Sequence, residues 1–147
     1  MNGFLIYLED NPAEQLIMKY AFDDLNTSNC ELICFSSGEE FLEFLNFSGK
    51  HAHRVRLTGK FLILIDVNLG SISGFEVLKS LKYHQGERAP DLTAMMMSSS
   101  RRDTEIKLAN QLGAKDFITK PLDYGGVKDI IQKLLTEVIP LENPLTL

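Results

Sequence analysis

One pattern occurs five times along the 147 residues: a short apolar run ends abruptly at a polar residue, and an amphipathic stretch follows it. The apolar runs occupy residues 4–8, 31–35, 61–65, 92–97 and 117–118. Short apolar runs with polar ends are typical of buried parallel strands. Strands that alternate with helices predict an α/β fold, in which helices cover both faces of a parallel sheet.

Local signals mark where several of the intervening helices begin and end. Asn11 is a candidate N-cap, and Pro12 suits the first helical position. Ser37 and Glu40 form the capping-box pattern of a second helix, and Gly113 is a candidate C-terminal cap of the fourth. Helical spacing predicts that the first helix has one apolar stripe, formed by Leu16, Ile17, Tyr20, Ala21 and Leu25.

Length and composition predict one domain over residues 1–139, with a polar and basic extended loop at about 46–60 and a tail at 140–147. The net charge of -5 argues against a general nucleic-acid binder, which would carry a basic patch. The chain lacks an apolar stretch of the roughly 18 residues that a membrane span needs, and its N-terminus lacks a signal pattern. We therefore expect a cytoplasmic protein without membrane or nucleic-acid partners.

The cysteine pair and the histidines are candidate functional residues outside the strand ends, and for the histidines we favour a solvated surface over binding to the acidic face of a partner. Cys30 and Cys34 are spaced so that they could hold a metal or form a disulfide, but alternation places both on one face of a strand. We predict buried free thiols. His51, His53 and His84 lie in polar stretches, and we expect all three to be solvated.

Polar side chains follow four of the five apolar runs, and they are the candidates for chemistry. They are Glu9, Asp10, Asp66, Ser98 and Lys120. The carboxyl ends of parallel strands lie at one edge of the sheet, where open α/β sheets bind ligands. Three carboxylates there repel one another unless cations hold them, and Lys120 with Mg²⁺ would supply those cations. An aspartate beside Mg²⁺ and a lysine can attack phosphorus, so this cluster is suited to forming an aspartyl phosphate.

Each of these residues also has a simpler interpretation. Asp66 could cap the turn that follows it, and Glu9 with Asp10 could favour the dipole of the next helix. Ser98 begins a serine run that could cap a helix, and Lys120 could be an exposed loop residue. The occurrence of all of them at strand ends favours a shared site.

Four segments carry a resemblance to a known family: residues 8–12, 64–69, 97–100 and 113–121. In this order, and each at a strand end, they resemble the receiver domains of bacterial two-component response regulators over about residues 3–138. The resemblance implies a stand-alone receiver with a flavodoxin-like (βα)5 fold, a doubly wound parallel sheet of strand order 2-1-3-4-5.

The resemblance also implies a role for each matching residue at the metal and acceptor positions. Asp66 resembles the phosphoacceptor. Asp10 resembles a direct Mg²⁺ ligand, Glu9 a ligand that acts through water, and Asn68 the position whose backbone carbonyl completes the protein ligands. The family often has proline where this chain has Gly70, which changes no reacting group.

Three further residues match positions that respond to phosphorylation in the family. Ser98 is similar to the hydroxyl residue that bonds the phosphoryl group, and Lys120 to the lysine that pairs with it. Phe117 is similar to the aromatic switch residue. The resemblance implies a cis bond between Lys120 and Pro121.

The resemblance implies a signalling protein, not an enzyme with an external substrate. A histidine kinase or a histidine phosphotransfer protein would donate the phosphoryl group, and a downstream target would read the change of shape, through a monomer or a phosphorylation-dependent dimer. A phosphorylation-independent interaction domain is one alternative. A haloacid-dehalogenase-like phosphatase is another, but that family has an aspartate where this chain has Asn68.

Overall fold

The computed structural model describes residues 3–84 and 91–139, and it contains every strand and helix that the sequence predicts. The 3-10 helices η1 and η2 occur in addition. The elements in chain order are β1 (Gly3–Leu8), α1 (Pro12–Asp24), β2 (Cys30–Phe35), α2 (Gly38–Asn46), η1 (Gly49–His51), β3 (Lys60–Asp66), α3 (Gly74–Leu81), η2 (Lys82–His84), β4 (Leu92–Ser98), α4 (Asp103–Gln111), β5 (Asp116–Thr119) and α5 (Tyr124–Val138).

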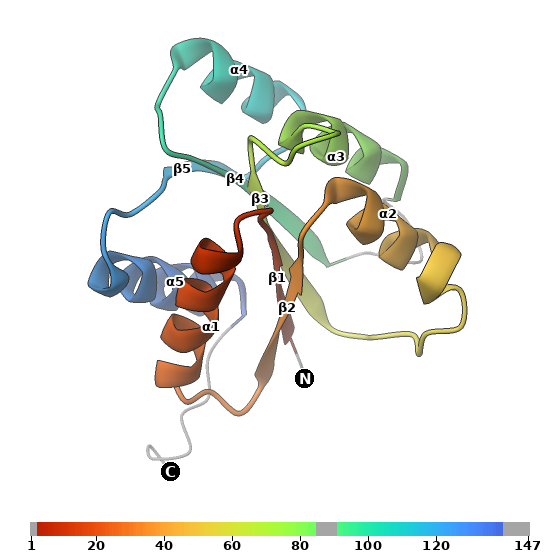
Figure 1. The fold of residues 1–147 in the computed structure, drawn as a ribbon, viewed down its shortest axis with the longest axis horizontal. Coiled ribbons are helices and arrows are strands. Elements are labelled where there is room, and N and C mark those ends of the chain that lie inside the picture. Colours follow the sequence, from red (N-terminus) through yellow and green to blue (C-terminus); the bar gives the residue numbers. More distant parts are fainter. Residues whose placement is uncertain (1–2, 85–90, 140–147) are drawn as a thin grey trace.

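The five strands form one parallel sheet in the order β2-β1-β3-β4-β5, which confirms the predicted flavodoxin-like topology. The central strand is β3, and Asp66 is its last residue. Helices α1 and α5 lie side by side on one face of the sheet, while α2, α3 and α4 lie on the other (Figure 1). All five strands run in one direction, so their carboxyl ends share one edge.

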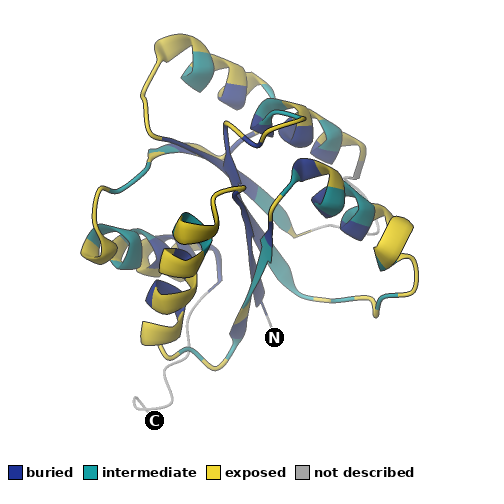
Figure 2. Ribbon diagram, viewed as in Figure 1, coloured by how far each residue is buried: buried dark blue, intermediate teal, exposed yellow. Residues whose placement is uncertain are grey.

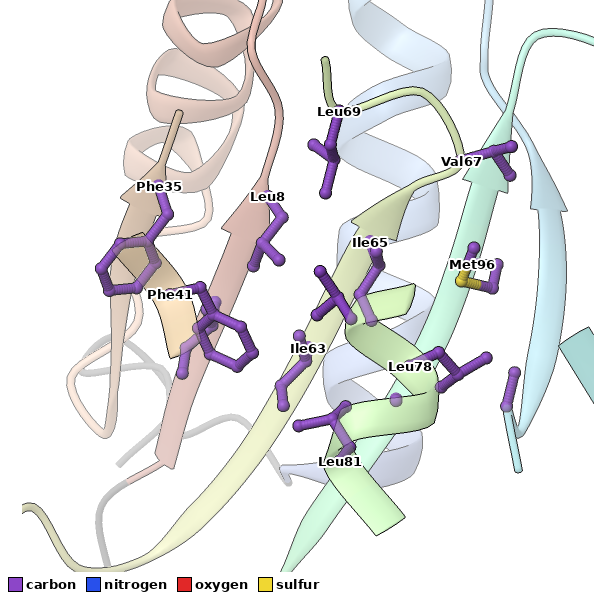
Figure 3. Close-up of a cluster of buried hydrophobic side chains, with 14 of the residues drawn as sticks. Leu8, Phe35, Phe41, Ile63, Ile65, Val67, Leu69, Leu78, Leu81 and Met96 are labelled. Carbon is purple, nitrogen blue, oxygen red and sulfur yellow. The ribbon is translucent and has the colours of Figure 1, made fainter. Parts of the chain in front are cut away.

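Strand alternation divides the core into two apolar layers. One layer contains Leu8, Ile63, Ile65 and Met96, which point toward α2 and α3 together with Leu78 and its neighbours (Figure 3). The other layer takes the intervening strand residues and packs them against α1 and α5; its strand members include Leu5, Tyr7, Leu62, Leu64, Met95 and Met97. The Met95–Met97 run is thus core strand, as its composition predicts.

Helix α1 differs from its predicted apolar stripe. Met18, Ala21 and Phe22 are its buried residues, whereas Leu16 and Tyr20 are 49% and 59% exposed. The outer surface of α1 accordingly stands out as exposed in Figure 2. Helical spacing alone does not distinguish a stripe that faces the sheet from one displaced around the helix, so the prediction is right for Ala21 and wrong for Leu16 and Tyr20.

The predicted extended loop at 46–60 is partly ordered. Asn46 belongs to α2, and η1 follows within the loop. The Arg54 guanidinium lies 3.8 Å from the ring centroids of both Phe44 and Phe47, and its Nε donates to the Phe44 carbonyl at 2.8 Å. Stacking of a guanidinium between two aromatic faces fixes the loop against the end of α2.

His51 was expected to be solvated, but its ring packs edge-on against Phe35 and Phe44 and its Nε2 lies 3.3 Å from a Glu40 carboxylate oxygen. His53 is exposed, as predicted, and the side chain of His84 lies outside the described residues. Cysteine behaves as predicted: both thiols are free, Cys30 buried and Cys34 half-buried. Burial raises the pKa of the Cys30 thiol to about 11.

The described ends of the chain meet at the amino edge of the sheet. Ile139, just after α5, packs against the backbone of Gly3, where a β-carbon would overlap the Ile139 side chain. The predicted tail at 140–147 lies outside the described residues. Within the part of the chain that the structure describes, each helix is too short or too polar to cross a bilayer.

Candidate phosphoacceptor site

Three of the predicted site residues converge at the carboxyl edge of the sheet. The Lys120 Nζ lies 2.8 Å from Asp66 Oδ2 and 2.6 Å from Glu9 Oε1. The side chains of Asp66 and Glu9 are 6% and 1% exposed, and that of Lys120 is 16% exposed. Residues from the ends of β1, β3 and β5 therefore form one buried ionic cluster, as the strand endings predict.

The alternation of the strands explains why these side chains meet. Side chains two positions apart in a strand point to the same face of the sheet. Leu64, Tyr7 and Ile118 point to the α1–α5 face. The side chains two positions after them therefore point to the same face, and these are Asp66, Glu9 and Lys120. The backbone of Lys120 is also held across the edge, because its amide donates to the Ser98 carbonyl at 2.8 Å.

Glu14 is a fourth member of the cluster that sequence reasoning missed. Its Oε2 lies 2.8 Å from Lys120 Nζ, and its side chain is 39% exposed. The N-cap Asn11 places it, since the Asn11 side chain accepts from the amides of Ala13 and Glu14. A single glutamate in the first turn of a helix normally serves the helix dipole, so its contact with a residue 106 positions away gives no signal in the sequence.

Burial and the contacts within the cluster shift the pKa values of its members. Burial raises the pKa of Glu9 to about 9, and its hydrogen bonding with Glu14 acts in the same direction. Burial alone would lower the pKa of Lys120, but hydrogen bonds to Asp66, Glu14 and Glu9 raise it above its ordinary value. Hydrogen bonding with Glu9 lowers the pKa of Glu14, and Lys120 lowers it further. Lys120 therefore stays charged as the cation of the cluster.

Ser98 and Phe117 lie on the other side of the same edge. Ser98 is 2% exposed, and its hydroxyl oxygen accepts from the Ser100 amide at 3.2 Å and lies 3.3 Å from the Ser100 hydroxyl. The Phe117 ring is buried in the core layer beneath α2, α3 and α4. Arg101 donates to the Phe117 carbonyl at 3.3 Å and so joins the loop after β4 to β5.

The two remaining predicted residues lie beside the cluster. Asp10 is exposed, and its carboxylate faces the turn at Gly70, where a β-carbon would lie 3.9 Å from Asp10 Oδ2. Gly70 has φ of 83°, a conformation that glycine adopts without strain. The Asn68 amide donates to Asp66 Oδ1 at 3.0 Å, which orients the carboxylate of the central strand.

Gly74, the first residue of α3, allows the loop between β3 and α3 to turn tightly against Asp66. A β-carbon at Gly74 would overlap the Asp66 carbonyl oxygen, and the Gly74 amide donates to the Val67 carbonyl at 2.9 Å. Glycine is therefore required by this close approach of two backbone segments.

The bond between Lys120 and Pro121 is trans, so the expectation of a cis bond is wrong. Trans is the intrinsically favoured form of such a bond, by about 0.5–1 kcal/mol. Lys120 reaches its three carboxylate partners with the chain in this form.

The oxygen atoms of the cluster fit a hard divalent cation. Glu9, Glu14 and Asp66 each offer a carboxylate oxygen, and these oxygens lie within 4.8 Å of one another. Mg²⁺ prefers such oxygen ligands and usually binds through one or two carboxylates and several waters. One lysine faces three carboxyl groups in this cluster, and burial with the neighbouring carboxyls raises the pKa of Glu9, so a further cation would favour its ionised form.

Comparison with known proteins agrees with the topology. The sequence model of the family described as "Response regulator receiver domain" matches residues 5–132. The two-component response regulator ARR7 of Arabidopsis thaliana is 29% identical over 112 residues, which are 76% of this chain and 53% of that protein. The chemotaxis protein CheV2 of Helicobacter pylori is 32% identical over 97 residues, 65% of this chain and 28% of that protein. The chain spans about half the length of ARR7 and of ARR3, another Arabidopsis relative.

Solved structures share the fold over almost the full chain. The phosphorylated cyanobacterial phytochrome response regulator RcpA superposes with a TM-score of 0.79 at 23% identity, covering 95% of each chain. The Mn²⁺-bound form of the response regulator Rcp1 superposes with a TM-score of 0.76 at 20% identity, covering 96% of this chain and 98% of that one.

Proposed function

Because this chain belongs to the family of response regulator receiver domains, whose role is phosphoacceptor signalling, we propose that Asp66 is its phosphoacceptor. One observation carries the proposal: Asp66 ends the central strand with its carboxylate 2.8 Å from a lysine ammonium and beside the buried Glu9. A carboxylate with adjacent cations can act as a nucleophile toward phosphorus, since the cations offset the charge of the transferring group.

The transfer is a displacement at phosphorus. An Asp66 oxygen forms the new bond to phosphorus, and the bond from phosphorus to the donor atom breaks with its electron pair on the donor. That donor is a phosphorylated histidine of a kinase or a histidine phosphotransfer protein, or a small acyl phosphate. Lys120 neutralises charge on the phosphoryl oxygens, and the Ser98 hydroxyl donates to one of them after transfer.

Glu9, Asp10 and Asp66, with the backbone carbonyl of Asn68, would hold Mg²⁺. When bound, Mg²⁺ supplies positive charge beside the phosphoryl oxygens. The position of Asp10 beside the turn at Gly70 supports this role, although Asp10 lies outside the group of carboxylates that approach within 4.8 Å. Asp66 is oriented independently of a metal, by the amide of Asn68.

The phosphoryl group adds about 1.5 to 2 negative charges and three acceptor oxygens, which only a rearranged pair of loops after β4 and β5 would satisfy. Ser98 is the last residue of β4, where the first of these loops begins, Phe117 lies in β5, and Lys120 follows β5. We propose that this rearrangement biases two conformations of the domain, and that a downstream protein binds one of them. Residues 1–139 would form this receiver domain.

The decisive measurement is the intact mass of the protein after incubation with acetyl phosphate and Mg²⁺. We expect one added phosphoryl group in the wild type, and none in Asp66→Asn or without Mg²⁺. Steady turnover of phosphate esters would instead indicate a phosphatase. A wild type that stays unmodified with both acetyl phosphate and phosphorylated histidine kinases would contradict the proposal and leave a phosphorylation-independent interaction domain.

A further inference from the structure

The contact between Glu14 and Lys120 has no part in the transfer described above. Glu14 belongs to the first turn of α1, and its Oε2 lies 2.8 Å from Lys120 Nζ. The backbone beneath it is fixed on both sides, because Asn11 accepts from the Glu14 amide and the Gln15 side chain donates to the Glu9 carbonyl. The reach of Glu14 toward Lys120 is therefore set by an ordered helix start and not by a mobile loop.

Lys120 has no spare hydrogen-bond donor in this arrangement. An ammonium group carries three N–H donors. Three carboxylate oxygens accept from it, at 2.6 Å from Glu9, 2.8 Å from Glu14 and 2.8 Å from Asp66. A phosphoryl oxygen on Asp66 can thus pair with Lys120 only if at least one of these contacts is given up.

The three partners differ in what else they do. Glu9 and Asp66 are buried and belong to the set that would hold Mg²⁺, so a bound cation would draw their oxygens away from the ammonium. Glu14 is 39% exposed and is not required by that set. Once the metal is in place, Glu14 is the carboxylate among these three that still attracts Lys120 away from the phosphoryl group.

We propose that Glu14 is a positioning residue, which holds Lys120 in the unphosphorylated protein and competes with the phosphoryl group for its ammonium. The inference rests on the proposed function and deepens it. Glu14 then sets how favourable the phosphorylated arrangement is, and acts through Lys120 without touching the reacting atoms. Removal of its charge makes pairing between Lys120 and the phosphoryl group more favourable.

The test uses Glu14→Gln, which keeps an oxygen acceptor of the same length and removes the charge. Beryllofluoride with saturating Mg²⁺ mimics the phosphoryl group at equilibrium, and its affinity is measured beside the affinity for Mg²⁺ alone. We expect beryllofluoride to bind about two- to fivefold more tightly to Glu14→Gln, the range expected for loss of one half-exposed ion pair. The affinity for Mg²⁺ alone should fall somewhat, because a negative charge near the metal is lost, but less than in Asp10→Asn, which removes a proposed ligand.

Glu76→Gln is the matched control. Glu76 has the same helical position in α3, where its amide donates to the N-cap Ser73 as the Glu14 amide donates to Asn11, and its side chain is exposed. Glu76→Gln should leave both affinities unchanged. Urea unfolding of each variant checks that the fold is kept, so that a merely structural effect of Glu14 is separated from an effect on phosphoryl pairing.

Two results would overturn the inference while leaving Asp66 as the acceptor. One is a Glu14→Gln protein that is labelled by acetyl phosphate but binds beryllofluoride no more tightly than wild type. The other is a loss of Mg²⁺ affinity in Glu14→Gln as large as that in Asp10→Asn, which would make Glu14 a metal ligand and not a competitor for Lys120. If wild type neither takes the label nor binds beryllofluoride, the proposed function fails first, and the role of Glu14 falls with it.

Discussion

The two flanks of the site rest on opposite faces of the sheet and are held by different forces. The lysine flank, on the α1–α5 side, consists of Lys120 and three carboxylates joined by hydrogen bonds of 2.6 to 2.8 Å. The serine flank, on the side of α2, α3 and α4, consists of the buried Phe117 ring and the Ser98 hydroxyl, which hydrogen-bonds with the amide and the hydroxyl of Ser100.

Ionic contacts thus hold the lysine flank together, and apolar packing holds the serine flank. Each carboxyl group of the lysine flank already contacts Lys120, so a ligand there must exchange one set of ionic contacts for another. On the serine flank the polar group is bonded only locally, while apolar packing fixes the backbone around it. Variants of the lysine flank should therefore respond to added cations, and variants of the serine flank should not.

The largest effect is expected from Lys120→Gln, which removes the ammonium from among three carboxylates. We expect a loss of about 3 kcal/mol in the free energy of unfolding, because removal of one partner leaves buried charge uncompensated. Mg²⁺ should restore part of it by binding the folded form. Urea titrations with and without Mg²⁺ measure both quantities.

Lys115→Gln serves as the control for that prediction, since Lys115 is exposed on the turn before β5 and should tolerate the change. A loss below about 1 kcal/mol in Lys120→Gln would show that the cluster contributes little to stability. Ionic contacts would then stabilise the lysine flank no more than local contacts stabilise the serine flank.

A smaller effect is expected from Phe117→Leu on the serine flank. The ring is 6% exposed in the apolar layer, so a smaller apolar side chain should cost about 1 kcal/mol in the free energy of unfolding. The loss should be the same with and without Mg²⁺, because packing and not charge is changed. Recovery on addition of Mg²⁺ would argue that the two flanks are coupled in the unphosphorylated protein.

The smallest change in stability is expected from Ser98→Ala. Its hydroxyl bonds only within the turn to Ser100, so its loss should cost less than about 1 kcal/mol in unfolding. The same variant should bind beryllofluoride more weakly than wild type, because the phosphoryl group loses a donor. Unfolding midpoints that fall as far as those of Lys120→Gln would remove the distinction between the flanks.

The residues of the lysine flank show how far a sequence predicts a site. Asp66 and Lys120 could be placed together because each ends a strand, and parallel strands end at one edge. Glu14 could not, because its contact depends on the rotation of α1 about its own axis. The same rotation was misjudged from the apolar spacing, which assigned Leu16 and Tyr20 to the core.

The loop at 46–60 shows a second limit. Its polar and basic composition predicts a solvated connection, yet Arg54 is held between two aromatic rings and His51 packs beside Phe44. Stacking of a cation on an aromatic face has no periodicity and needs no fixed spacing. Such contacts depend on where the end of α2 lies, so they cannot be predicted before the helix has been positioned.

The meeting of Gly3 and Ile139 has a consequence for how this domain can be joined to others. Both lie at the amino edge of the sheet, and the six residues of β1 separate that edge from the site by about 20 Å. A circular permutant that links the two ends and opens the chain in the loop at 46–60 would leave every strand pairing and the acceptor edge intact. Fusion partners attached at either end would likewise be carried on the side remote from phosphoryl transfer.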